Sequence, residues 1–310
     1  MITEPIDVLK NHEIRKSRKQ KQAFRDAAQG YFESLGYKVA TEKGGYGARN
    51  LVIGDAENAK YLLTAHYDTC AGMLVPNLVT PRNLWGFLGY QVLITLILML
   101  PTFLVYWLSY LIFHDRSIAF LCFYVSLIAD VVLMMIGPAN PHTANDNTSG
   151  VVAVLQMAQM LSENQRKEYA FVLFDLEEVG LLGSSSYRRK HKAATSHQII
   201  LNLDCIGDGD ELWFFPGRKL RKDHEKMKLL QGLAGQAGSK VIHVHEKGFS
   251  VYPSDQANFP YGVGICALKK TRKGLLYMDR IHTKHDTVLD YENVNLLCQR
   301  LVGLAGEAVQ

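Results

Sequence analysis

The sequence predicts an α/β fold: a three-layer sandwich with a central mixed, largely parallel sheet, interrupted by a hydrophobic two-helix hairpin. Three observations support this prediction. Strand-like and helix-like segments alternate along most of the 310 residues, a pattern typical of parallel sheets covered by helices on both faces. The composition, with 48% hydrophobic and 21% charged side chains, excludes a disordered or collagen-like chain. A central stretch is far more apolar than the rest.

Before this stretch, the pattern predicts one helix followed by three strands. The helix is expected over residues 6–35, ending before Gly36. The strands are expected at residues 37–41, 50–53 and 61–66.

The apolar stretch, residues 83–137, is predicted to be an inserted transmembrane helical hairpin. Residues 83–113 contain no charged side chain, and residues 117–137 contain Asp130 alone. About 20 helical residues cross a bilayer core, so both segments are long enough. The alternative is a pair of wholly buried core helices, which would need a larger protein around them. Asp130 pairs within the hairpin or in an oligomer formed through it, or lies at the polar end of a shifted helix.

The charges beside the hairpin predict a multi-pass membrane protein whose remaining chain is cytoplasmic. Five cations lie within Arg15–Lys21, and Arg82 directly precedes the first span, as the positive-inside rule describes. The five cysteines are odd in number and scattered, a pattern typical of reduced thiols. The net charge of +4 is too small to predict a nucleic-acid partner.

After the hairpin, helices and strands alternate again. The helices are expected at residues 150–161, 184–192, 220–237 and 291–308, and the strands at residues 170–176, 198–203, 212–215, 241–244 and 263–268. The first of these helices carries apolar residues at helical spacing. The predicted α/β domain therefore comprises residues 1–82 and 138–310.

Acids and imidazoles recur where predicted strands end, and this is where parallel sheets form ligand sites. The first strand with such an end leads into His66 and Asp68, which point to the same face at period two. Asp68 is placed to hold the second ring nitrogen of His66. Asp146 directly precedes a helix, so it is either a helix cap or a metal ligand.

Two adjacent glutamates, Glu177 and Glu178, follow a buried strand. Burying their charge would be costly without a cation, and one of them could bind metal while the other moves protons. Asp204 ends the next strand. The last motif contains His282, together with His285, which we do not assign to the site.

The ordered set His66-x-Asp68, Asp146-Asn147-x-Ser-Gly, Glu177-Glu178-x-Gly-Leu-Leu-Gly-Ser, Asn-Leu-Asp204 and His282-Thr-x-x-Asp-Thr resembles the twenty-eighth metallopeptidase family. That family contains bacterial leucyl aminopeptidases, glutamate carboxypeptidases and glutaminyl cyclases. The resemblance implies a phosphorylase/hydrolase-like zinc exopeptidase fold and two zinc ions that share one carboxylate.

The resemblance also implies the ligands of each ion. Asp146 bridges the two ions. His66 and Asp204 complete one site. Glu178 and His282 complete the other. Two Zn²⁺ ions, three carboxylates and one hydroxide then form a neutral site.

The function implied is that of a membrane-anchored zinc aminopeptidase that hydrolyses N-terminal residues through a metal-bound hydroxide. Glu177 is the general base and Asp68 orients His66. The substrate is a peptide with a free amino terminus. Tyr252 and Asp255 lie in a segment similar to the family's substrate-side segment, where Gln256 replaces a histidine.

Two alternatives stay open: a glutaminyl-cyclase-like acyltransferase with a single zinc, and a non-catalytic, receptor-like relative. The complete ligand set together with Glu177 argues against the second. The hairpin is inserted between Asp68 and Asp146, so its ends must lie near the metal site. We therefore expect the active site to open close to the membrane and to favour apolar or membrane-released peptides.

Overall fold

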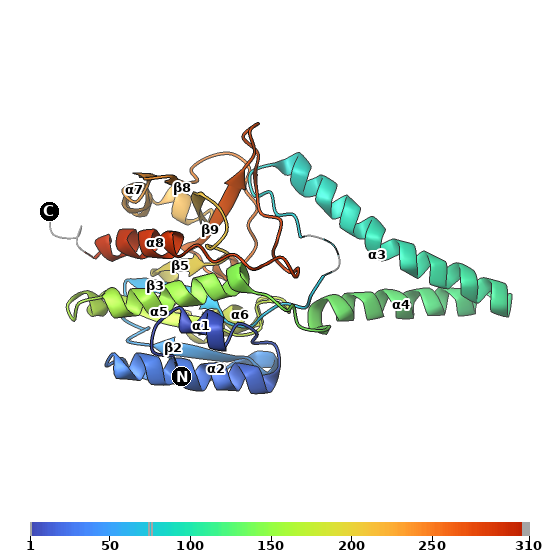
Figure 1. The fold of residues 1–310 in the computed structure, drawn as a ribbon, viewed down its shortest axis with the longest axis horizontal. Helices are drawn as coiled ribbons and strands as arrows, with labels where there is room; N and C mark the ends of the chain where they lie inside the picture. Colours follow the sequence, from blue (N-terminus) through green and yellow to red (C-terminus); the bar gives the residue numbers. More distant parts are fainter. Residues whose placement is uncertain (1, 74, 76, 306–310) are drawn as a thin grey trace.

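A computed structural model describes residues 2–73, 75 and 77–305. It contains a ten-stranded mixed sheet with helices on both faces, from which two long helices project to one side (Figure 1). The predicted α/β class with a helix-covered mixed sheet and two apolar helices is confirmed.

The sheet has the order β1-β2-β4-β3-β5-β9-β6-β8-β7, and β10 pairs with β9. The four central strands β4, β3, β5 and β9 are parallel, whereas antiparallel pairs flank them on both sides. The strands are β1 Val39–Lys43, β2 Arg49–Ile53, β3 Tyr61–His66, β4 Tyr169–Phe174, β5 Ile199–Leu203, β6 Glu211–Pro216, β7 Gly235–Ala237, β8 Lys240–Val244, β9 Gly262–Lys270 and β10 Leu276–Tyr277.

Eight α-helices are described within these residues: α1 Asp7–Asn11, α2 Arg18–Ser34, α3 Leu84–Phe113, α4 Arg116–Ile136, α5 Gly150–Met160, α6 Leu182–Lys190, α7 His224–Gln231 and α8 Tyr291–Gly303. The main core lies between one sheet face and helices that include α2, α5 and α8. A second apolar cluster, to which Tyr187 of α6 belongs, lies on the other face.

Successive side chains of the central strands point to opposite faces of the sheet, and both faces are buried. In β4, Phe171 and Leu173 join the main core, whereas Val172 and Phe174 join the second cluster. Both sets are apolar because a parallel strand is covered on both sides. The central strands therefore hold their carboxyl ends at a fixed edge, where the site is built.

The single N-terminal helix predicted over residues 6–35 is wrong, because the chain forms α1 and α2 with a break between them. Ser17 caps α2 by accepting a hydrogen bond from the Gln20 amide. Before this cap, the Arg15 side chain turns into the core and donates to the Tyr67 carbonyl and, at 3.0 Å, to the Thr148 hydroxyl. A continuous helix would leave these acceptors without their donor. The helix predicted at residues 220–237 is also shorter, because α7 ends at Gln231 and β7 follows.

The helices α3 and α4 leave the domain at separate places, converge away from it and pack against each other (Figure 1). Asn83 caps α3 and Asp115 caps α4, with His114 in a left-handed turn between the helices. Most large apolar side chains along both helices are exposed, so the alternative of buried core helices is wrong for this chain. Both helices are long and apolar enough to cross a bilayer.

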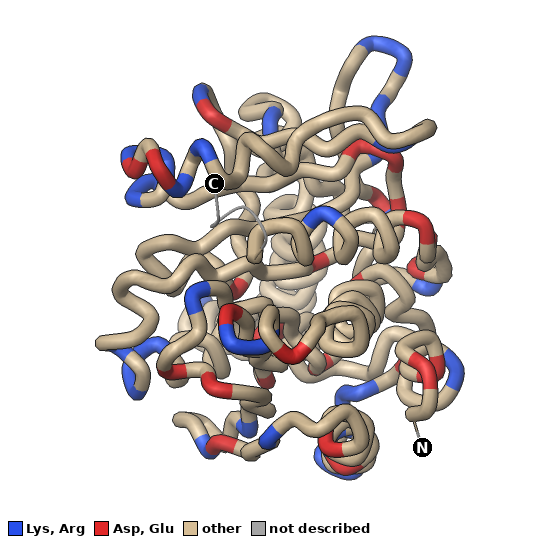
Figure 2. The backbone as a smooth tube through the Cα atoms, turned by 90° about the vertical axis from the view of Figure 1, so that its left-hand side faces the viewer, with Lys and Arg blue, Asp and Glu red and all other residues tan. Residues whose placement is uncertain are grey.

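Charged residues of both signs are spread around the end of the domain opposite the hairpin (Figure 2). They are not gathered into a patch of one sign there.

Candidate metal centre

The candidate metal centre is built at the carboxyl ends of three neighbouring parallel strands. His66 ends β3, Glu177 and Glu178 follow β4, and Asp204 follows β5. Asp146 joins them from the turn before α5.

His282 reaches the same place from the loop before α8. The structure thus brings together all five residues that the resemblance assigned to metal, within three groups of ligand atoms, of which one shares Asp146 with the second and Asp204 with the third. It also places Glu177 in one of these groups, with His66 and Asp204.

Asp146 lies between two imidazole–carboxylate pairs. Its Oδ1 is 3.3 Å from His66 Nε2, and its Oδ2 is 2.9 Å from His282 Nε2. His66 Nε2 is also 3.5 Å from Asp204 Oδ1. His282 Nε2 is likewise 3.4 Å from Glu178 Oε2. Each oxygen of Asp146 therefore faces a separate pair.

The charges of this cluster are poorly compensated by protein alone. Burial, together with neighbouring carboxylates, raises the pKa of Glu177 well above its ordinary value and raises the pKa of Glu178 to about 8. Burial by itself would lower the pKa of His282, but Glu178 and Asp146 outweigh it and raise the pKa to about 9. The cluster thus retains protons that a bound cation would displace.

Asp68 supports the centre through backbone contacts. Its carboxylate accepts the amide N–H groups of Glu177 at 3.0 Å and of Glu178 at 3.3 Å. His66 Nδ1 lies 3.1 Å from the Asp68 carbonyl oxygen and 3.7 Å from Asp68 Oδ1. Asp68 therefore fixes both the imidazole and the start of the loop that carries the two glutamates.

Asp286 holds the turn that carries Asp146, a role that sequence reasoning missed. Its carboxylate accepts the amide N–H groups of Asn145 at 2.8 Å and of Asp146 at 3.0 Å. Asn147 adds to this support because its side chain donates to the Leu203 carbonyl at 2.9 Å. Both residues belong to the ordered motifs of the sequence, but their roles depend on contacts between segments far apart in the chain.

Three residues of the centre have a left-handed backbone: Leu176 (φ 58°), Cys205 (φ 56°) and His282 (φ 61°). Such a conformation costs a non-glycine residue about 1–3 kcal/mol, so it persists where the surroundings fix it. Leu176 directly precedes Glu177, and Cys205 directly follows Asp204. The backbone is thus constrained at three of the segments that deliver the polar groups.

Two thiols also lie close to the cluster. Cys70 groups with Asp146, Glu178 and His282, and Cys205 groups with Asp146 and Asp204. Burial raises the pKa of both thiols well above the ordinary value. They are therefore protonated, in contrast to activated nucleophiles.

A cavity of about 270 Å³ opens onto the centre. Tyr252 lines it and donates a hydrogen bond to the Asp204 carbonyl at 2.9 Å. Asp255 is fully buried and is not among the lining residues. The first turns of α3 contribute Phe87, Tyr90 and Gln91 to the wall, a contribution that sequence reasoning did not foresee.

The residues present fit zinc. Imidazole nitrogens and carboxylate oxygens are typical Zn²⁺ ligands, and the centre supplies two of the former and three of the latter within reach of one another. Glu178 Oε1 is buried without a hydrogen-bond partner among the described residues. An orphaned buried carboxylate oxygen needs a cation or a donor to offset its desolvation.

An α/β sheet with such a cluster of imidazoles and carboxylates at its carboxyl edge is typical of metal-dependent hydrolases. The profile of Peptidase family M28 matches residues 126–297, which is more than half of the chain. The chain therefore belongs to Peptidase family M28.

One curated relative is Aminopeptidase YwaD of Bacillus subtilis (strain 168), with 31% identity over 139 residues. The match covers 38% of this chain and 29% of the relative, so the chain spans less than a third of that protein's length. The match supports a peptidase.

Solved structures share the fold. The LapA aminopeptidase of Legionella pneumophila has a TM-score of 0.58 at 14% identity, covering 98% of this chain and 70% of that chain. Porphyromonas gingivalis glutaminyl cyclase has a TM-score of 0.56 at 15% identity, covering 99% and 98%. Macrostomum lignano glutaminyl cyclase has a TM-score of 0.59 at 13% identity, covering 99% and 89%. Aminopeptidases and cyclases therefore share this architecture.

Proposed function

We propose that the chain is a membrane-anchored di-zinc aminopeptidase. The observation that carries the proposal is the position of Asp146, whose two oxygens face two separate imidazole–carboxylate pairs. His66 with Asp204 would hold one ion, His282 with Glu178 would hold the other, and Asp146 would be shared. When bound, zinc ions polarise a scissile carbonyl and lower the pKa of water.

Glu177 is the general base in this proposal. It lies beside His66 and Asp204, and it is not needed as a ligand when the five other residues hold the metal. Its carboxylate takes a proton from the attacking water and delivers it to the departing amine. Asp68 positions it through the Glu177 amide.

The substrate is a peptide with a free, apolar N-terminal residue. Phe87 of α3, with Leu78, Val79 and Val251, gives the cavity an apolar side. The polar centre itself forms another part of the cavity lining. An apolar side chain can therefore be held against α3 while the adjacent amide lies at the polar groups.

The hairpin anchors the catalytic domain, residues 1–82 and 138–310, to the cytoplasmic face of a membrane. Its exposed apolar helices support a membrane location, and Arg82 with the cations of Arg15–Lys21 supports the sidedness. Replacing residues 83–137 by a Gly-Ser linker should release the protein from the membrane fraction. Continued sedimentation with membranes after this replacement would contradict the anchoring.

The test of catalysis is hydrolysis of an aminoacyl-amide panel by purified protein, with and without chelator. We expect cleavage of apolar aminoacyl amides, loss of cleavage with chelator, and recovery with zinc. Glu177→Gln should bind zinc normally and lose activity by at least about 100-fold, the usual range for a general base. Normal cleavage by Glu177→Gln would rule out its proposed role.

A second function is favoured by the glutaminyl cyclases of the same fold, which cover almost the whole chain. In that case the protein would cyclise N-terminal glutamine with one zinc. Assay of a Gln-peptide, read together with the metal content, separates the two. Cyclisation without amide hydrolysis, with one zinc per chain, would replace the aminopeptidase proposal.

A further inference from the structure

A second, larger cavity lies beside the metal centre, between the start of α2 and the turn that joins β1 to β2. It has a volume of about 750 Å³, within the range of small-molecule sites. Six cationic side chains and a single carboxylate line it. We call this the basic cavity; its charged residues are Arg18, Lys19, Lys21, Arg25, Lys43, Arg49 and Asp175.

The carboxylate is already engaged. Asp175 Oδ1 accepts a hydrogen bond from Lys21 Nζ at 2.7 Å, and Asp175 Oδ2 accepts one from the Arg49 amide at 3.0 Å. Arg25 donates to the Tyr67 hydroxyl at 2.6 Å and to Gln22 at 2.6 Å. The side chains of Lys21 and Arg25 are therefore buried and held in place by hydrogen bonds.

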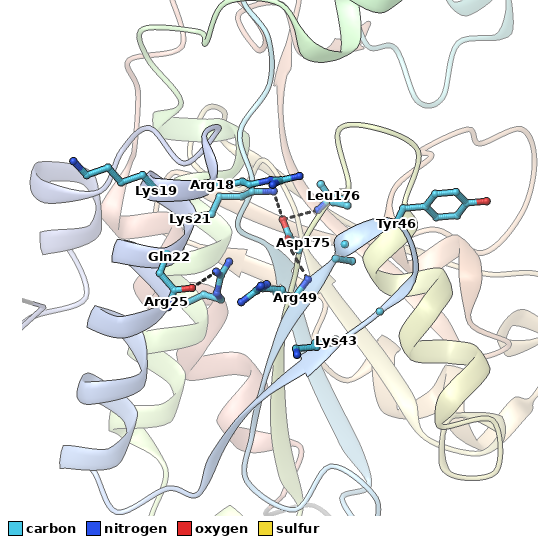
Figure 3. Close-up of a pocket in the computed structure, with 13 residues that line it drawn as sticks. Arg18, Lys19, Lys21, Gln22, Arg25, Lys43, Tyr46, Arg49, Asp175 and Leu176 are labelled. Carbon is cyan, nitrogen blue, oxygen red and sulfur yellow. Dashed lines mark hydrogen bonds and ion pairs between the residues drawn. The ribbon is translucent and has the colours of Figure 1, made fainter.

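The other cations have no acidic partner. Among residues 2–73, 75 and 77–305, no carboxylate lies within ion-pair distance of Arg18, Lys43 or Arg49. The side chains of Arg25 and Arg49 point toward each other across the hollow, and Arg18 lies above them (Figure 3). Like charges gathered without a counter-charge repel one another, and a bound anion would reverse that cost.

The basic cavity lies near the base of the hairpin. Lys16 Nζ donates to the Met135 carbonyl, in the last turn of α4, at 3.1 Å. Consecutive Cα atoms are about 3.8 Å apart, so Arg18 begins α2 within about 8 Å of Lys16. If α4 ends at the bilayer surface, as the proposed anchoring requires, the cavity lies at the depth of the lipid headgroups.

Tyr46 stands at the rim of the basic cavity and is 86% exposed. It points away from the hollow in Figure 3. Exposed aromatic residues of this kind are enriched at membrane interfaces. The rim of the basic cavity is therefore suited to contact a membrane interface, which is partly apolar and partly ionic.

We propose that the basic cavity binds a phosphate group carried by an anionic molecule. In the membrane, this molecule is an anionic phospholipid, and the phosphate belongs to its headgroup. Guanidinium groups match phosphate oxygens through paired hydrogen bonds, and Arg18, Arg25 and Arg49 supply three of them. Lys43 adds a further positive charge on the β1 side. The part of the proposal that assigns the phosphate to a lipid rests on the proposed membrane anchoring. The binding of a phosphate group in the basic cavity does not.

The test uses the full-length protein in a neutral detergent, with bound lipids counted by native mass spectrometry. Short-chain phosphatidylglycerol is compared with phosphatidylcholine of the same chain length. The test variant is Arg18→Gln/Lys43→Gln/Arg49→Gln. The matched control, Lys167→Gln/Lys222→Gln/Lys228→Gln, removes three exposed cations from positions outside the basic cavity.

We expect the wild type and the control to retain phosphatidylglycerol over phosphatidylcholine. A cation near an anionic surface contributes about fivefold in affinity, so the test variant should bind about 100-fold more weakly. Inorganic phosphate added as a competitor separates the sources: displacement at low millimolar concentration identifies soluble phosphate as the ligand, and no displacement identifies the lipid. Equal retention of both lipids, or the same retention by test variant and control, would overturn the proposal.

Zinc content and amide hydrolysis are measured on the same samples. If the lipid preference is absent while zinc and hydrolysis are normal, the phosphate site alone is refuted. If zinc and hydrolysis are absent while the preference persists, the proposed enzyme is refuted and the phosphate site stands.

Discussion

Asp286 offers the sharpest mutational test of how the candidate metal centre is held, because it supports the centre without facing the substrate. It is 1% exposed, and its two carboxylate oxygens accept the amides of Asn145 and Asp146. In Asp286→Asn one oxygen becomes an amide nitrogen of the same size. One buried backbone N–H then loses its acceptor and faces another donor.

The magnitude follows from that loss. A buried donor left without a partner costs about 1–3 kcal/mol. The affected amide belongs to the turn that carries Asp146. Part of this free energy is therefore lost from metal binding, because Asp146 is held less firmly in its position as a ligand. Partners that hold metal ligands typically change metal affinity by about 10–100-fold when mutated, which is about 1.4–2.7 kcal/mol.

The assay is competitive zinc titration against a chromophoric chelator, with thermal unfolding of the zinc-free protein measured in parallel. We expect zinc affinity to fall about 10–100-fold and the zinc-free form to unfold several degrees lower. Asp26→Asn, an exposed change on α2, is the control and should leave both unchanged. Zinc affinity within threefold of the wild type for Asp286→Asn would refute the reasoning.

Three further predictions follow from other contacts. Phe87→Ala should raise KM for peptides with a large apolar N-terminal residue more than for those with alanine, because Phe87 lines the cavity; equal effects on both substrates would show that α3 does not contact the substrate. Lys21→Met should destabilise the fold by about 3–5 kcal/mol in denaturant unfolding, because it leaves the buried Asp175 carboxylate without its cation; a loss below about 1 kcal/mol would contradict this ion pair. Glu211 accepts from Lys270 at 2.9 Å and from His243, and these contacts, opposed by partial burial, lower its pKa below 4.5. Its contribution to stability is therefore complete above pH 4.5 and is lost as the pH falls through the lowered pKa. Glu211→Gln should have a lower unfolding temperature than the wild type at pH 7, and this difference in unfolding temperature should shrink in acid. A difference that is the same at all pH values would contradict this.

The alternation of strands and helices predicted the fold class because β3, β4 and β5 are short apolar runs bounded by polar residues. Acids and imidazoles at their ends predicted where His66, Glu178 and Asp204 would meet. This prediction was within reach of the sequence because parallel strands place their carboxyl ends at one edge.

Features set by contacts between distant segments were beyond sequence reasoning. Arg15 looks like one more cation in a basic segment, yet the carbonyl of Tyr67 and the hydroxyl of Thr148 draw it into the core and divide the first helix. Phe87 and Tyr90 look like ordinary residues of an apolar span, yet both line the cavity at the metal centre, next to residues from other segments of the chain. The basic cavity likewise combines cations from α2, β1 and β2, and no local pattern joins them.

The metal content of the purified full-length protein tests the central claim most directly. After saturation with zinc and removal of the excess, elemental analysis should find two zinc ions per chain in the wild type. His282→Ala, which removes one of the two imidazoles beside Asp146, should leave one. Binding of no zinc by the folded wild type, or of a single ion that His282→Ala does not affect, would contradict the proposed pair.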